Sequence, residues 1–132
     1  MIEVVTAVLA LFVLQSFIPT AIQYLGSSGT FSSKMVGALG PRDTPPPMPA
    51  IAGRAQRALI NLAEGMMVFV PLALLAIFLE RADGLVLTGA LLFLVGRIAY
   101  LPAYMWGVVG LRSVIWGVSA TGLLIMAVAL LS

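Results

Sequence analysis

The chain has 132 residues, of which 61% are hydrophobic and only 9% are charged, and its mean hydropathy is +1.13. Soluble domains are nearer a quarter charged, so this composition excludes a soluble globular protein and predicts an integral membrane protein. Cysteine and histidine are both absent from the sequence, which excludes disulfides, thiol nucleophiles and a histidine general base. Any chemistry must therefore use a reactive group that a substrate or cofactor brings. We expect no metal ion and no nucleic acid as a partner.

The first apolar span covers about residues 4–25, long enough to cross a bilayer as a helix. A signal peptide is the rival interpretation. It is disfavoured because no basic segment precedes the span, Glu3 stands at its front and the apolar run is too long. Gln15, Ser16 and Pro19 interrupt the span, which predicts a kinked helix whose polar groups face other helices.

Residues 26–50 are predicted to form a long loop. Gly26-Ser-Ser-Gly29 breaks the first helix, and a run of prolines makes the second half of the loop stiff and extended: Pro41, Pro45, Pro46, Pro47 and Pro49. A proline-rich partner motif is an alternative, but a rigid spacer is simpler. Apolar residues between Phe31 and Leu39 have rough helical spacing, which also leaves a short interfacial helix open.

Three more apolar spans follow, at about residues 51–80, 85–106 and 111–131. A short charged turn ending at Gly84 separates the first two, and a turn at residues 107–110 separates the last two. Asp83 and Ser113 are positioned to cap the helices that follow them. The sequence therefore predicts one all-α domain over residues 1–132, an integral membrane bundle of four transmembrane helices.

The distribution of charge predicts the orientation of this bundle. Basic residues gather at the long loop and at the helix ends on the same face: Lys34, Arg42, Arg54, Arg57 and Arg112. On the other face, Arg81 alone stands against Glu3, Glu80 and Asp83. The positive-inside rule then puts the long loop in the cytoplasm and both termini outside.

The second span begins with a polar stripe. At the helical period, Arg54, Arg57, Asn61 and Glu64 share one narrow face, and the next fifteen residues, 65–79, carry no charge. An ionisable group in the bilayer costs roughly 2.5–3.5 kcal/mol on insertion scales. The stripe therefore needs a binding site, a lock between helices, or both.

A second stripe lies on the third span, where Arg97, Tyr100 and Tyr104 share one face at a similar depth. Arg112 and Ser113 reach the same end of the bundle from the start of the fourth span. The arginines of the two stripes and Arg112 together outnumber Glu64 by three, and a guanidinium does not lose its proton. A cation beside a helix N-terminus favours an anion between them, so the pattern predicts a site for a thiolate, carboxylate or phosphate.

Structural explanations compete with this interpretation. Arginines near membrane surfaces often extend to lipid headgroups, and a lock through Glu64 and Arg97 explains part of the pattern equally well. Tyrosine is common at membrane interfaces, and we assign Trp106 and Trp116 to such a belt or to packing. Small residues on the fourth span indicate close helix approach: Gly117, Thr121 and Gly122.

The three polar motifs, in order, resemble those of a known superfamily. They are similar to motifs of the MAPEG proteins, the membrane-associated proteins of eicosanoid and glutathione metabolism. The motifs in this sequence are Arg57-Ala-x-x-Asn61-x-x-Glu64, Gly96-Arg97-x-x-Tyr100-x-x-x-Tyr104 and Arg112-Ser113. The resemblance covers essentially the whole chain and is closest to small bacterial members of the microsomal glutathione transferase type. It implies a homotrimer of four-helix subunits, in the inner membrane if bacterial, with glutathione bound between neighbours near the cytoplasmic face.

The resemblance also implies roles for individual residues. Those implied to contact or support glutathione are Arg57, Asn61, Glu64, Arg97, Tyr100, Tyr104 and Ser113, and Arg112 would stand beside its sulfur. Catalysis would rest on Arg112, which stabilises the thiolate, and on Tyr104. A thiol with a pKa of about 8.5 needs a nearby cation or helix N-terminus to ionise at neutral pH. The implied activity is glutathione-dependent transfer to, or peroxide reduction on, a small apolar electrophile arriving from the membrane lipid.

Two other functions stay open at this point. One is a non-catalytic membrane protein that binds a lipid or another anion in the same basic pocket. The other is a structural subunit whose polar stripes only join helices. Binding of glutathione to the purified protein would separate the enzyme from both.

Overall fold

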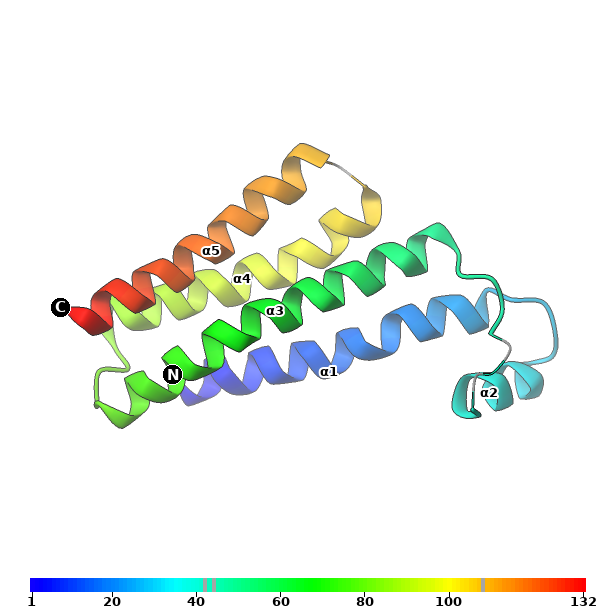
Figure 1. Cartoon of the computed structure of the whole chain (residues 1–132), viewed down its shortest axis with the longest axis horizontal. Coiled ribbons are helices and arrows are strands. Elements are labelled where there is room, and N and C mark those ends of the chain that lie inside the picture. The colour runs from blue at the N-terminus through cyan, green and yellow to red at the C-terminus, as the bar shows by residue number, and fades with distance from the viewer. Residues whose placement is uncertain (42, 44, 108) are drawn as a thin grey trace.

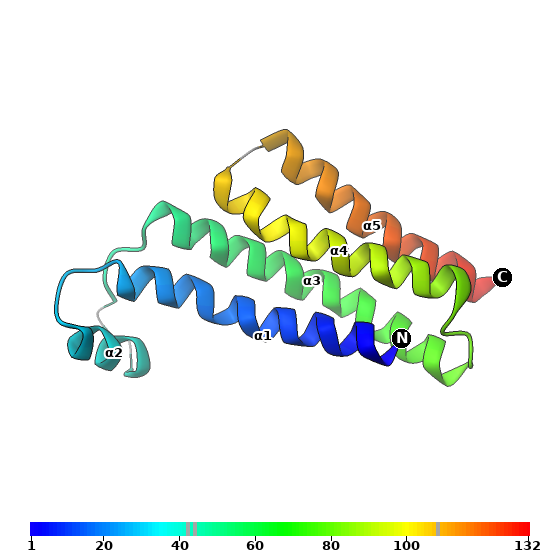
Figure 2. The same ribbon diagram turned by 180° about the vertical axis from the view of Figure 1, so that it is seen from behind.

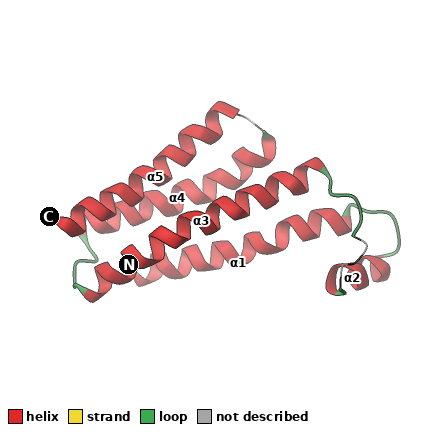
Figure 3. Cartoon of the chain, viewed as in Figure 1, coloured by secondary structure: helices red, strands yellow, loops and turns green. Residues whose placement is uncertain are grey.

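The computed structural model describes residues 1–41, 43, 45–107 and 109–132. Arg42, which entered the orientation argument, lies outside the described residues. Figure 3 shows that the described chain is helical, and its helices are α1 (Ile2–Leu25), α2 (Phe31–Leu39), α3 (Ala50–Phe78), α4 (Gly84–Trp106) and α5 (Val109–Leu131). All but α2 are long and apolar enough to cross a membrane. The protein is thus an all-α integral membrane protein, as its composition predicts.

The four long helices follow one another across the molecule in the order α1, α3, α4, α5 (Figure 1). Among the described residues, α1 and α5 make no contact, so they form opposite edges of the bundle. Figure 2 shows the same arrangement from behind, with both termini at the end that carries the α3–α4 turn. The opposite end carries α2 and the α4–α5 turn, and the two polar stripes of α3 and α4 lie towards that end.

The apolar core fills the half of the bundle near the termini. Its largest fully buried side chains there are Val8 from α1, Phe69 from α3, Phe93 from α4 and Met126 from α5. The rings of Phe69 and Phe93 stack with their centroids 4.7 Å apart and their planes 7° from parallel. Burial of these side chains joins all four long helices at this end.

Small residues bring α4 and α5 into close contact. A Cβ atom on Gly89 would lie only 2.5 Å from the carbonyl oxygen of Gly122, and a Cβ on Gly96 would collide with Ser119. Such small-residue contacts let membrane helices approach closely, as predicted for Gly122. Gly117 does not share this role within the subunit, because a Cβ there would meet nothing within 4 Å.

The helix starts can be compared with the sequence predictions. The loop 26–50 contains α2, the short helix that the apolar spacing left open, and it begins after Thr30, whose side chain accepts a bond from the Ser33 amide at 3.4 Å. The helix α5 begins at Val109, so Ser113 lies inside the helix and does not cap it. Asp83 occupies the N-cap position of α4, but its side chain makes no capping hydrogen bond.

Candidate functional site

The two predicted polar stripes meet between α3, α4 and α5, at the end where α4 turns into α5. A hollow of about 320 Å³ is lined by Asn61, Tyr100, Tyr104, Arg112, Ser113 and Trp116. A second hollow of about 220 Å³ is lined by Asn61, Glu64, Gly65, Arg97, Trp116, Ala120 and Leu123. Because Asn61 and Trp116 line both, the two hollows adjoin. We call them the arginine hollow, after Arg112, and the glutamate hollow, after Glu64.

Asn61 connects the two charged residues of the glutamate hollow. Its amide oxygen accepts a hydrogen bond from Arg97 Nη1 at 2.5 Å, and its amide nitrogen donates to Glu64 Oε2 at 3.4 Å. Arg97 is only 4% exposed, whereas Glu64 is exposed. The predicted lock between Glu64 and Arg97 is therefore indirect, and Glu64 keeps most of its capacity to accept hydrogen bonds.

Gly65 makes room for the buried guanidinium. A Cβ atom at this position would lie 2.6 Å from Arg97 Nη2, so even alanine would displace the side chain. Arg97 Nε is buried and has no hydrogen-bond partner among the described residues. A buried unsatisfied donor on a charged group is costly and calls for an explanation, and a nearby anion is one.

In the described residues, the guanidinium groups of the site contact aromatic rings and form no ion pairs with carboxylates. Tyr100 and Tyr104 meet edge to face, with centroids 5.4 Å apart. The guanidinium carbons of Arg112 and Arg57 lie 4.9 and 5.9 Å from the Tyr104 centroid, and that of Arg97 lies 5.8 Å from the Tyr100 centroid. Cation–π contacts of this kind stabilise the positions of the cations but leave their charge uncompensated.

The Tyr104 hydroxyl can donate a hydrogen bond to a group bound in the arginine hollow. Its oxygen accepts a hydrogen bond from Arg57 Nε at 3.3 Å. A phenol oxygen that accepts a bond still has its own hydrogen to donate. Since Tyr104 lines the arginine hollow, that hydrogen is available to a group bound there.

The predicted convergence of four arginines is wrong for Arg54. Its Nη1 donates to the backbone oxygen of Met105 at 3.0 Å, at the C-terminal end of α4. A cation there stabilises the negative end of the helix dipole and satisfies a carbonyl that has no partner within the helix. Arg54 therefore has a structural contact, whereas Arg97 and Arg112 line the hollows and Arg57 adjoins them through its hydrogen bond to Tyr104.

Trp116 is a site residue that the sequence argument missed. It was assigned to an interface belt or to packing, yet it lines both hollows. The signal was present, because Trp116 follows Arg112 by four residues and so shares its helix face. It is the residue of α5 that lines both hollows.

The charges of the site do not balance within the subunit. Arg57, Arg97 and Arg112 stand near one carboxylate, that of Glu64, and no ion pair joins any of these groups in the part of the chain that the structure describes. Each guanidinium keeps several donors, and Ser113 lies beside Arg112 on the rim. The arrangement can therefore bind a ligand with several negative groups, and Glu64 can accept one positive group.

Four long apolar helices, three of which line a hollow with charged and aromatic side chains, define a polytopic membrane protein with a pocket among its helices. The chain belongs to the MAPEG family, whose model matches residues 2–132. Members of this family are membrane-associated and generally use glutathione. Neither the curated proteins nor the solved structures include a match to this chain.

Proposed function

We propose that the protein is a glutathione-dependent transferase or peroxidase that acts on apolar electrophiles dissolved in the membrane. The observation that carries this proposal is the pair of adjoining hollows, one lined by Arg112 and the other by Arg97 and Glu64, with Arg57 hydrogen-bonded to the Tyr104 hydroxyl of the first. Bound glutathione would supply a thiol that, once ionised, attacks an electrophile or reduces a peroxide.

The residues fit the charges of glutathione, which has two carboxylates, one ammonium group and a thiol. The exposed carboxylate of Glu64 in the glutamate hollow suits the ammonium group. Arg57 and Arg97 would bind the carboxylates, and the unpartnered Arg97 Nε supports such an anion nearby. Asn61 lines both hollows, so it would hold the middle of the ligand.

Arg112 is the residue best placed to stabilise a thiolate. It is the fourth residue of α5, where the partial positive charge of the helix N-terminus adds to that of the guanidinium. Both favour the ionised form of a bound thiol. Ser113 would line the site beside Arg112, and the free hydrogen of Tyr104 would point to sulfur or to the substrate. Tyr100 would position Tyr104 and Arg97.

The exposure of Glu64 supports an oligomer. Glu64 lies near the middle of α3, a helix that spans the membrane, and it is exposed in the single subunit. A bare carboxylate at that depth is strongly disfavoured in lipid. We therefore propose that a neighbouring subunit of a homotrimer covers this face, in keeping with a family that is usually trimeric. The long loop and the site would face the cytoplasm, with both termini outside.

The experiment is a pair of titrations on the purified, detergent-solubilised protein. Glutathione should bind in calorimetry, and its ultraviolet difference spectrum at neutral pH should show the thiolate. S-methylglutathione, which has no ionisable thiol, is the matched control and should bind without the thiolate signal. Absence of glutathione binding would overturn the proposal. Binding without ionisation would favour the alternative, a non-catalytic protein that holds an anion in the same pocket.

A further inference from the structure

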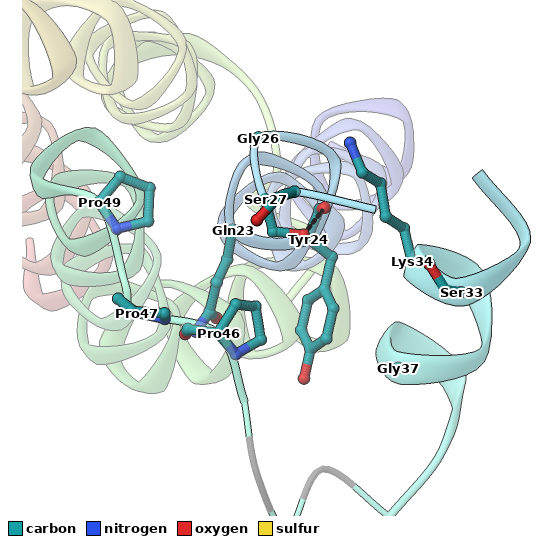
Figure 4. A pocket seen from close by; sticks show the side chains of 11 residues that line it. Gln23, Tyr24, Gly26, Ser27, Ser33, Lys34, Gly37, Pro46, Pro47 and Pro49 are labelled. Carbon is teal, nitrogen blue, oxygen red and sulfur yellow. Dashed lines mark hydrogen bonds between the residues drawn. The ribbon is translucent and has the colours of Figure 1, made fainter. Parts of the chain in front are cut away.

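A further hollow lies outside the proposed site, between the end of α1, α2 and the proline segment (Figure 4). It measures about 600 Å³. Its lining consists of polar side chains, glycines and prolines: Gln23, Tyr24, Gly26, Ser27, Ser28, Ser33, Lys34, Gly37, Pro46, Pro47 and Pro49. None of these residues has a role in the proposed reaction, so the hollow needs a separate explanation.

Tyr24 gives the first indication of a ligand. Its side chain is 6% exposed, and its hydroxyl is buried without a hydrogen-bond partner among the described residues. Figure 4 shows the ring projecting from α1 with its hydroxyl between Pro46 and Gly37. The ring packs on Gly37 of α2, where a Cβ would lie 3.1 Å from it. A buried hydroxyl normally has a partner, and Tyr24 is one of the residues that line the hollow.

The walls of this hollow are fixed by side chains. Gln23 Nε2 donates to the backbone oxygen of Pro46 at 2.7 Å, which ties the proline segment to α1. Lys34 Nζ donates to the backbone oxygen of Leu25 at 2.9 Å, which ties α2 to the end of α1. The Lys34 ammonium has two further hydrogens to donate, so it can hold this carbonyl and an anion together.

An apolar groove continues from the same point. It measures about 340 Å³ and lies between α1 and α2, lined by Ser16, Phe17, Thr20, Ala21, Tyr24, Leu25, Lys34, Met35, Ala38 and Leu39. Tyr24 and Lys34 line both the polar hollow and the groove. A polar chamber with a cation at its border and an apolar channel leading away from it match an amphiphile with an anionic head.

We propose that the polar hollow and the groove together bind one anionic phospholipid of the bilayer. Lys34 Nζ donates to its phosphate, Tyr24 Oη donates to another oxygen of its polar head from the opposite end of the Tyr24 ring, and one acyl chain lies in the groove along α1. The charge of the site specifies an anionic lipid, because the lining residues that the structure describes include Lys34 and no acid. The groove follows a membrane-spanning helix, which places an acyl chain at hydrocarbon depth and the phosphate at the interface.

The test measures lipid binding to the full-length protein in neutral detergent by native mass spectrometry, with thermal unfolding as a second readout. Phosphatidylglycerol is compared with phosphatidylcholine of the same chains and with inorganic phosphate alone. The variants are Tyr24→Phe, which removes only the unpartnered hydroxyl, and Lys34→Gln. Arg81→Gln is the control for loss of one positive charge, because Arg81 lies at the opposite end of the bundle.

Wild type and Arg81→Gln should bind phosphatidylglycerol more tightly than phosphatidylcholine. Lys34→Gln should lose about tenfold in affinity for phosphatidylglycerol, the usual size for one hydrogen bond to a charged group, and Tyr24→Phe should lose about fivefold, the usual size for a neutral hydrogen bond. Without lipid, Tyr24→Phe should unfold at the same or a higher temperature than wild type. Equal binding of both lipids to wild type, full binding by both variants, or full stabilisation by phosphate alone would each overturn the proposal. Glutathione binding should be unchanged in Tyr24→Phe, so this proposal and the proposed function fail separately.

Discussion

The two halves of the bundle are built from the same helices but differ in what fills them. Near the termini, apolar side chains from all four long helices pack against one another. Near the α4–α5 turn, the space between α3, α4 and α5 is left as hollows lined by charged and aromatic residues. Phe93 marks the boundary, because it stacks on Phe69 and also lies 5.0 Å under the guanidinium of Arg97.

The difference shows how one subunit combines stability with binding. Burial of apolar side chains and close contact of small residues hold the helices at the core half. Because the core half supplies stability, the arginines of the polar half need not form ion pairs within the subunit. Three guanidinium groups therefore keep hydrogen-bond donors for a ligand. Substitutions in the core half should therefore change the free energy of unfolding, whereas substitutions in the polar half should change binding or turnover.

Phe69→Ala should have the largest effect on the free energy of unfolding. Phe69 is fully buried and stacked on Phe93, so its truncation leaves a cavity and should destabilise the protein by about 3–5 kcal/mol. Chemical unfolding followed by circular dichroism in detergent measures this value. Molecules that remain folded should bind glutathione as wild type does. A loss below about 1 kcal/mol, the size of a methylene deletion, would show that the core lies elsewhere.

Arg112→Ala should have the largest effect on catalysis. Without the guanidinium, the proposed thiolate loses its main stabilising charge, and turnover should fall about a hundredfold, as when one stabilising donor is removed from other enzymes. Glutathione affinity should fall much less, because Arg57 and Arg97 remain. Steady-state kinetics with a soluble model electrophile, together with calorimetry, separate the two quantities. Arg112→Lys should restore part of the turnover, and equal turnover in Arg112→Ala would contradict the role.

Gly65→Ala should weaken glutathione binding without a change in charge. The new methyl group would lie 2.6 Å from Arg97 Nη2, so the guanidinium must shift from its bond with Asn61. Affinity should fall about tenfold, since one charge-assisted hydrogen bond is disturbed. Gly53→Ala on the same helix is the matched control, because its Cβ would make ordinary contacts at 3.5 Å or more. If both substitutions weaken binding equally, the close contact between Arg97 and Gly65 does not determine glutathione affinity.

Composition and apolar runs predicted the helical membrane fold, and helical periodicity predicted the two stripes. Asn61, Tyr100 and Tyr104 line the arginine hollow because residues three and four apart share one face of a helix, and that rule needs only the sequence. The apolar runs likewise predicted four spanning helices, which the structure contains. The roles of these residues toward glutathione remain predictions.

Other features needed coordinates. The separation of Arg54 from the site depends on where α4 ends, which places the Met105 carbonyl beside it, and helix ends are the least predictable part of a sequence pattern. The start of α5 at Val109 removed Ser113 from a capping position for the same reason. The contact of Gly65 with Arg97 is a packing relation between two helices, and spacing within one helix does not contain it.

The smallest predicted effect comes from Arg54→Gln, compared with Arg57→Gln one turn further along the same helix. Both substitutions remove one positive charge from the polar stripe of α3. Arg54 donates to the Met105 carbonyl at the C-terminal end of α4 and lines neither hollow, so its loss should destabilise the protein by about 0.5–1 kcal/mol and leave glutathione affinity unchanged. Arg57 holds the Tyr104 hydroxyl, so Arg57→Gln should weaken glutathione binding and slow turnover. Unfolding curves and calorimetry on the two variants side by side measure the contrast, and a matching loss of affinity in Arg54→Gln would extend the site to the end of α4.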